Sequence, residues 1–210
     1  MAAQTANDIS TSKSPTLTLS QRKLKALEPE LYSSRSWQKF LRENGYRLAA
    51  PNEDASHWKS YVEENLRRGD FRAAVVVSAS PLLIATYASE LDCIAMLRFT
   101  DQLVPKYDLS DGTQLLAVNL YLEWNFFLPE DLNPGPRQTG KYRNFAPMIA
   151  DFLTDDANLV EEKKAGIAKA EWRRAEALGR EYLKWHGERA RDGRPLLCHL
   201  PAKEPEKKRN

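Results

Sequence analysis

The residues best suited to binding chemistry lie in one glycine-containing stretch, residues 135–144, which reads GPRQTGKYRN. This stretch places three basic side chains, Arg137, Lys141 and Arg143, around an aromatic residue, Tyr142. Guanidinium and ammonium groups bind phosphates and carboxylates through charge-assisted hydrogen bonds. The stretch therefore predicts a site for a ligand that carries a phosphate or a carboxylate.

A helix is expected to begin directly after this stretch, with Asn144 as its N-cap. The apolar residues that follow have helical spacing and are Phe145, Met148, Ile149, Phe152 and Leu153. Free N–H groups at a helix N-terminus bind anions, so they would complete the site. The predicted ligand-binding residues are Arg137, Lys141, Tyr142, Arg143 and Asn144. The alternative interpretation is a solvated basic loop that only connects a strand to a helix.

The same stretch has the spacing of a P-loop, in which a glycine, four residues and Gly-Lys follow one another from Gly135 to Lys141. Tyr142 stands where that motif requires a Ser or Thr hydroxyl to hold magnesium. Pro136 also removes one backbone N–H donor from the loop that would cradle the phosphates. Both departures argue against a nucleoside triphosphate site.

No other group of residues has the types and spacing of a catalytic or metal centre. Cys93 lies in an apolar segment, where a thiol is usually inert packing, so we expect Cys198 to be the more reactive thiol. His186, Cys198 and His199 lack the fourth ligand and the spacing of a zinc site. The sequence therefore predicts no catalytic residue, no metal and no cofactor, and it argues against an enzyme.

The composition is that of a soluble globular protein, since 42% of the 210 residues are hydrophobic and 29% are charged. The net charge is only +2, which argues against a global attraction to nucleic acid. The sequence has no run of about 20 apolar residues and no apolar signal region near its N-terminus. We therefore expect a cytoplasmic protein that does not contact a membrane.

The longest apolar block, residues 73–99, should form the centre of a β-sheet. The β-branched run at residues 75–77 favours a strand, and the polar break at residues 89–92 predicts a turn between two further strands. Residues 113–122 predict a fourth strand. Because these strands are apolar on both sides, helices should cover both faces of the sheet.

Helices are expected on either side of this block in the sequence. A short helix should span residues 21–27, and two further helices should begin at Ser36 and at Ser56. The last element, at residues 159–189, should be one long helix. Its narrow apolar line consists of Ile167, Ala168, Trp172, Ala175, Leu178, Tyr182 and Trp185. Such a line resembles a coiled-coil seam and would contact the sheet, a partner or a second copy.

The sequence thus predicts an α+β fold with one domain at residues 21–190, between a disordered tail at residues 1–20 and a C-terminal tail at residues 191–210. We expect a mainly antiparallel sheet of about four strands, covered by N-terminal helices and a long C-terminal helix. The function that fits best is a non-catalytic interaction or regulatory module, with an unidentified protein partner or self-association through the C-terminal helix. The alternatives are a small enzyme or ligand-binding protein that uses loop 137–144, and a weak nucleic-acid binder.

Overall fold

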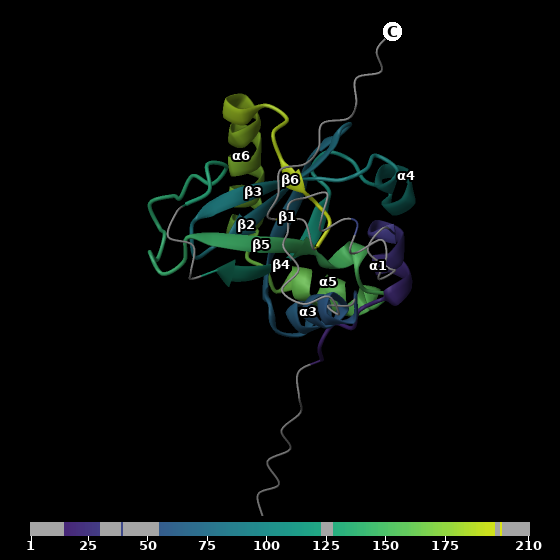
Figure 1. Ribbon diagram of the computed structural model, residues 1–210. Helices are drawn as coiled ribbons and strands as arrows, with labels where there is room; N and C mark the ends of the chain where they lie inside the picture. Colours follow the sequence, from purple (N-terminus) through teal and green to yellow (C-terminus); the bar gives the residue numbers. More distant parts are fainter. Residues whose placement is uncertain (1–14, 30–38, 40–54, 123–127, 196–197, 199–210) are drawn as a thin grey trace, which may run out of the picture.

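The computed structural model describes residues 15–29, 39, 55–122, 128–195 and 198. Within these ranges, helices pack on one six-stranded sheet to form an α+β domain, as the sequence predicts (Figure 1). The predicted helix that begins at Ser36 and most of the two predicted tails lie outside the described residues.

The described sheet has the strand order β5-β4-β1-β2-β3-β6. Its strands are β1 (Asp70–Ala79), β2 (Leu82–Ala88), β3 (Cys93–Arg98), β4 (Gln114–Leu122), β5 (Asn144–Ile149) and β6 (Arg191–Asp192). All neighbouring pairs are antiparallel except β3 and β6, which are parallel. The prediction of about four antiparallel strands therefore holds for β1 to β4 but misses β5 and β6, which make the sheet larger and mixed.

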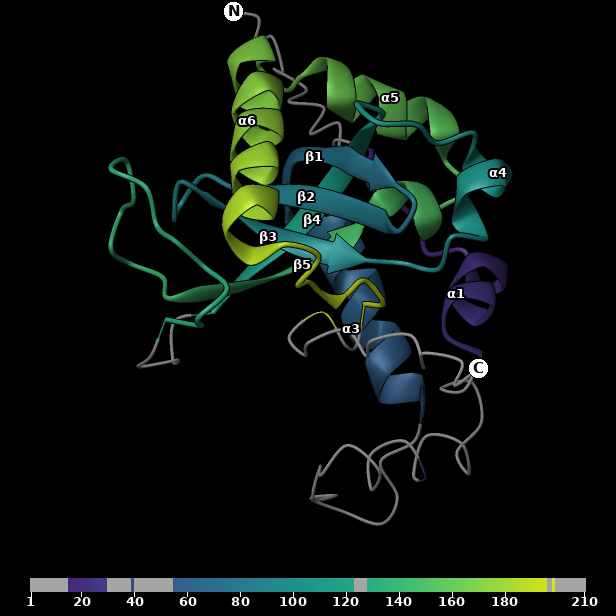
Figure 2. The ribbon, with the colours of Figure 1, turned by 90° about the horizontal axis from the view of Figure 1, so that it is seen from above.

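The helices are α1 (Gln21–Leu27), α3 (Ala55–Arg68), α4 (Leu103–Tyr107), α5 (Ala157–Ala165) and α6 (Lys169–His186). The helix predicted at residues 21–27 is confirmed, and Ser20 caps it by accepting a hydrogen bond from the backbone N–H of Lys23. The single long helix predicted at residues 159–189 is instead two helices, because the chain turns between Ala165 and Lys169. Figure 2 shows α6 lying across β1, β2 and β3, with α5 beside it.

Both faces of the central strands are buried, which explains why their sequences do not alternate between apolar and polar residues. On one face, Val75, Ala85 and Met96 pack against Trp172 and Tyr182 of α6. The cluster on the opposite face includes Val76, Ile84, Leu97, Leu115 and Phe152.

The side chain of Arg191 joins the two edge strands of the sheet. Arg191 lies in β6 and is only 4% exposed. One of its amino groups donates a hydrogen bond to the carbonyl of Phe145 in β5 at 2.8 Å, and another donates to Oδ1 of Asp131 at 3.0 Å. Because β5 and β6 stand at opposite ends of the strand order, these bonds require a sheet that curls until its edges meet.

The packed part of the chain therefore extends beyond the predicted limits at residues 21 and 190. At the N-terminal side, Leu17 is buried in a cluster with Leu24 of α1. At the C-terminal side, Arg191 is buried in β6 and Cys198 is buried in the main core, although both fall in the predicted tail.

The sequence predicts a helix at residues 144–153, and this prediction is wrong. They form β5 and a short 3₁₀ helix, η2 (Ala150–Phe152). All six residues of β5 are buried, so apolar residues are not limited to alternate positions and their spacing resembles that of a helix. Pro147 is tolerated because β5 is an edge strand, which has one side without ladder hydrogen bonds.

Candidate functional site

The predicted ligand-binding stretch lies in a loop, residues 128–143, that packs against the turn between β2 and β3. The backbone N–H of Gly135 donates a hydrogen bond to the carbonyl of Leu91 at 3.0 Å. A Cβ atom at Gly135 would lie 2.4 Å from Oδ2 of Asp92, so a glycine is required for this close approach. The β2–β3 turn therefore positions the loop.

The carboxylate of Asp92 is the centre of the contacts that hold this loop. Its side chain is fully buried, and its Oδ1 accepts hydrogen bonds from the hydroxyl of Tyr87 at 2.8 Å and from Arg137 at 3.0 Å. Arg174 of α6 donates to Oδ1 at 3.3 Å and to Oδ2 at 3.0 Å. We call these four residues the Asp92 cluster. The cluster joins the loop to β2, to the turn and to α6.

The surroundings of Asp92 keep its carboxylate ionised. Burial alone would raise the pKa of Asp92, but hydrogen bonds from Arg137, Tyr87 and Arg174 outweigh burial and lower it from 3.8 to about 2. Burial and the hydrogen bond to Asp92 raise the pKa of Tyr87 to about 12, so Tyr87 stays a neutral donor. Asp92 therefore acts as a fixed negative charge between two guanidinium groups.

Three of the five predicted ligand-binding residues are accessible to a partner. Arg137 contacts Asp92, yet its side chain is 66% exposed, so part of its guanidinium group remains available. Lys141 and Arg143 are also exposed, and the ammonium group of Lys141 lies 4.8 Å from the ring centre of Tyr142. The three cations of the predicted site are thus presented on an anchored loop.

The other two predicted residues, Tyr142 and Asn144, are more enclosed than the three cations. The ring of Tyr142 stacks on Tyr121, with 5.0 Å between ring centres, and it also contacts Lys141. Asn144 is buried at the start of β5, where its Oδ1 accepts a hydrogen bond from Arg191 at 3.1 Å. Because a strand begins at Asn144, the expected helix N-terminus and its free N–H groups are absent there, and that part of the predicted site is wrong.

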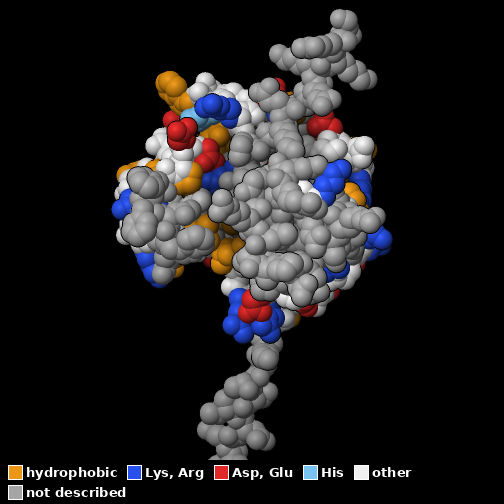
Figure 3. Space-filling view, in the orientation of Figure 1, with side chains coloured by type: hydrophobic (Ala, Val, Ile, Leu, Met, Phe, Trp, Pro, Cys, Tyr) orange, Lys and Arg blue, Asp and Glu red, His pale blue; other side chains and the backbone are white. Residues whose placement is uncertain are grey.

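A surface on the side of α6 that lies toward the Asp92 cluster was not predicted from the sequence. Arg174, Leu178 and Trp185 follow one another at intervals of four and seven residues, which places them on the same side of the helix. Trp185 is 78% exposed, whereas Leu178 is partly buried. Figure 3 shows a hydrophobic group protruding at the C-terminal end of α6, bordered by charged side chains.

The predicted apolar line of the C-terminal helix included Trp185, which is 78% exposed and does not pack on the sheet. The residues of α6 that are buried are Trp172, Ala175, Gly179 and Tyr182, and they form the stripe that faces the sheet. With 3.6 residues per turn, the next position on this buried stripe after Tyr182 is His186. Trp185 therefore falls beside the stripe. The sequence shows that Trp185 is an apolar residue, but its exposure depends on the rotation of α6 relative to the sheet.

Neither thiol of the described chain is activated. Cys93 is 2% exposed and Cys198 is 1% exposed, and burial raises the pKa of each to about 12. The expectation that Cys93 is shielded is confirmed, whereas the expectation that Cys198 is the more accessible thiol is wrong. Cys198 packs in the core and donates a weak hydrogen bond to the carbonyl of Pro195.

In the part of the chain that the structure describes, no three His, Cys, Asp or Glu side chains gather in a way that could hold a metal ion. None of the helices described is long and apolar enough to cross a membrane. Comparison of the chain with protein-family models, with curated proteins and with solved structures gives no match.

Proposed function

We propose that this protein is a non-catalytic interaction module that binds an acidic partner protein along α6 and the adjacent loop. The observation that carries the proposal is Trp185, which is 78% exposed beside the stripe of α6 that packs on the sheet. Tryptophan is enriched among the few residues that supply most of the free energy of protein–protein binding. An exposed tryptophan on a rigid helix therefore supports an interface.

The rigidity of α6 strengthens this proposal. Trp172 and Tyr182 are buried against the sheet, and Gly179 lies so close to β2 that a Cβ atom there would be 2.6 Å from the Cβ of Ala85. Such close packing fixes the backbone of α6, from which the side chain of Trp185 projects, before any partner arrives. Preorganisation of this kind lowers the entropic cost of binding.

The basic end of the same surface indicates the charge of the partner. Arg137 and Arg174 share one carboxylate, so the Asp92 cluster carries a net positive charge, and both arginine side chains are partly exposed. Along the helix, eleven residues separate Arg174 from Trp185, which corresponds to roughly 16 Å. We define the partner-binding surface as Arg137, Arg174, Leu178 and Trp185. It suits a segment with an acidic group at one end and an apolar side chain at the other.

The test compares Trp185→Ala with the matched control Lys184→Ala, an exposed neighbour that points to a different side of α6. Both variants should unfold at the temperature of the parent, since both side chains are exposed. Proteins that copurify with the tagged full chain in its native cells should be lost with Trp185→Ala and kept with Lys184→Ala. Calorimetry on the purified pair should then show at least about a tenfold loss of affinity for Trp185→Ala.

Two results would overturn the proposal. One is a partner that binds the parent and Trp185→Ala equally well. The other is a parent protein that enriches nothing over Trp185→Ala and remains monomeric in sedimentation velocity at every concentration. Concentration-dependent dimerisation that Trp185→Ala abolishes would assign the surface to a second copy of the chain instead of an acidic partner.

A second candidate function is the binding of a small phosphate or carboxylate by the loop, favoured by the exposed positions of Arg137, Lys141 and Arg143. Thermal-shift measurements with phosphate, nucleotides and dicarboxylates should then show stabilisation of the parent. The stabilisation should be weaker in Lys141→Ala and in Arg143→Ala. Binding that survives both substitutions would place the site elsewhere.

A further inference from the structure

A cleft lies on the other side of α6, between α5 and the N-terminal half of α6. Figure 2 shows the two helices side by side over β1, and the cleft between them has a volume of about 620 Å³. Its apolar lining comes from Val75 of β1, from Ile167 in the turn between the helices, and from Trp172 of α6. Small-molecule sites commonly have volumes of about 300–1,000 Å³, so the cleft is large enough for a ligand.

Two cations line this cleft without an acidic partner among the described residues. Lys169 and Arg173 are four residues apart, which places them on the same side of α6, and both are exposed. The other charged residues of the lining are Glu161, Lys164 and Glu176, and each of them is already paired. Lys164 pairs with Glu161 and with Asp151, and Glu176 pairs with Arg180 at 2.8 Å. Like charges at this spacing repel each other, and an anion between them would relieve the repulsion.

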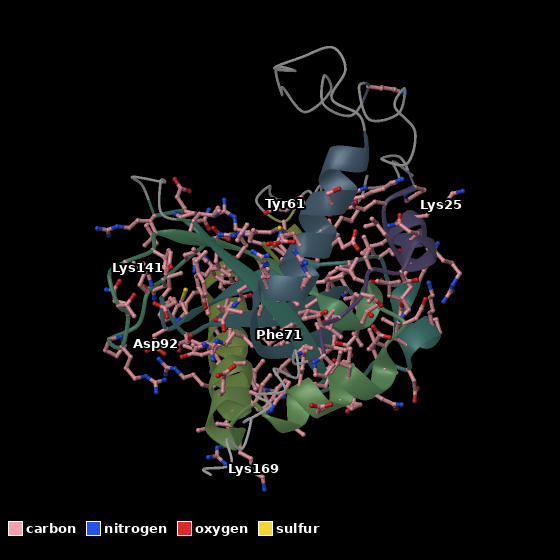
Figure 4. All side chains as sticks on the ribbon, turned by 90° about the horizontal axis from the view of Figure 1, so that it is seen from below. Lys25, Tyr61, Phe71, Asp92, Lys141 and Lys169 are labelled. Carbon is pink, nitrogen blue, oxygen red and sulfur yellow. The ribbon has the colours of Figure 1, made fainter. Side chains whose placement is uncertain are left out.

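We infer that this cleft binds a small organic anion, with its phosphate or carboxylate between Lys169 and Arg173. The apolar body of the ligand would lie against Trp172 and Ile167, and the side-chain amide of Gln114, which also lines the cleft, would donate a hydrogen bond. Figure 4 shows Lys169 at the N-terminal end of α6, away from Lys141 and Asp92. The cleft is therefore separate from the partner-binding surface and does not depend on the proposed function.

Phenyl phosphate is a suitable probe because it joins one anionic group to one flat apolar ring. Titration of the full chain, followed by NMR of the backbone amides, should shift the signals of Gln114, Lys169 and Trp172. The double variant Lys169→Gln/Arg173→Gln should bind the probe at least about tenfold more weakly, since each charge-assisted hydrogen bond contributes to affinity. The control Lys184→Gln removes a cation from α6 outside the cleft and should leave the affinity unchanged. Thermal unfolding should show that all variants are folded.

Comparison probes separate the two parts of the proposal. Inorganic phosphate should bind more weakly than phenyl phosphate, because it lacks the ring that contacts the apolar lining. Phenol should also bind more weakly, because it carries no anionic group at neutral pH. Equal affinity for phenyl phosphate and phenol, or equal affinity of the parent and the double variant, would overturn the proposed role of the cations. Equal affinity for inorganic phosphate would overturn the proposed contact with the apolar lining, and absence of binding to the parent would overturn the site.

Discussion

Substitution of Asp92 by Asn should loosen the part of the loop around residues 135–139 that packs against the β2–β3 turn. Asn has nearly the same size as Asp and also tolerates the left-handed backbone of this position, where φ is 48°. The change therefore removes the negative charge without adding backbone strain. Arg137 and Arg174 lose the carboxylate that they share.

The size of the effect follows from the pKa of Asp92, which is lowered from 3.8 to about 2 in the folded protein. A difference of this size between the unfolded and folded states corresponds to roughly 2–3 kcal/mol of stability at neutral pH. The carboxylate of Asp92 is buried, but Arg137 is 66% exposed, so solvent screens part of this interaction and the figure is an upper limit. A domain of ordinary stability has a total of about 5–15 kcal/mol, so Asp92→Asn should lower the free energy of unfolding measurably.

The pH dependence has a definite sign. Because the folded pKa lies below the unfolded one, the unfolded chain takes up the proton first when the pH falls. The stabilisation by Asp92 should be complete above about pH 5 and should disappear as the pH approaches about 2. The stability difference between the parent and Asp92→Asn should therefore be largest near neutral pH and should shrink in acid.

Urea unfolding of the parent and of Asp92→Asn at a series of pH values measures this difference. Glu162→Gln, which removes an exposed acid from α5, serves as the control and should change little. Hydrogen exchange provides a local readout, since the N–H groups of Gly135 and Thr139 bond to the β2–β3 turn and should lose protection in Asp92→Asn. A stability difference that stays constant from neutral pH to acid, or full protection of Gly135, would refute the reasoning.

The remaining predictions concern three other parts of the molecule. Native alkylation with a thiol reagent should be slow at both Cys93 and Cys198, and rapid labelling of either would contradict their burial and raised pKa. Trp172→Ala should cost about 3–5 kcal/mol in urea unfolding, whereas Trp185→Ala should be nearly neutral because its side chain is exposed. Arg191→Ala removes a buried guanidinium group whose partner Asp131 is 29% exposed, and it should lower the free energy of unfolding by about 1.5–3 kcal/mol. A parent-like unfolding midpoint for that variant would show that the contact between β5 and β6 does not stabilise the curled sheet.

The sequence pattern alone identified those strands and helices whose surroundings in the fold agree with the intrinsic secondary-structure preferences of their residues. The β-branched run of β1 and the polar breaks around β2 and β3 identified these strands, because such residues suit a pleated, crowded sheet. The segment at residues 21–27 was identified as α1, because a short helix depends on residues that are neighbours in the chain. The α+β class followed from these elements.

In β5 and at the end of α6, tertiary contacts decided the secondary structure and the exposure of side chains, and the local sequence pattern did not. The edge strand β5 is buried on both sides, so its apolar residues show no period of two, and a helical interpretation fitted equally well. The exposure of Trp185 depends on the rotation of α6 about its own axis, which the close approach of Gly179 to β2 fixes. No pattern within the helix sequence determines that rotation to within one residue.

For the candidate site, the sequence by itself determined which side chains were available, and the tertiary structure decided which of them remain accessible. The sequence showed the basic residues of the loop but not the carboxylate that anchors them, since Asp92 is 45 residues from Arg137 and 82 residues from Arg174. Charge pairing acts through space, and only packing brings such distant groups together. In the fold, Arg137 is partly engaged by Asp92, and Asn144 is buried with its Oδ1 bonded to Arg191. Trp185 remains exposed at the end of α6.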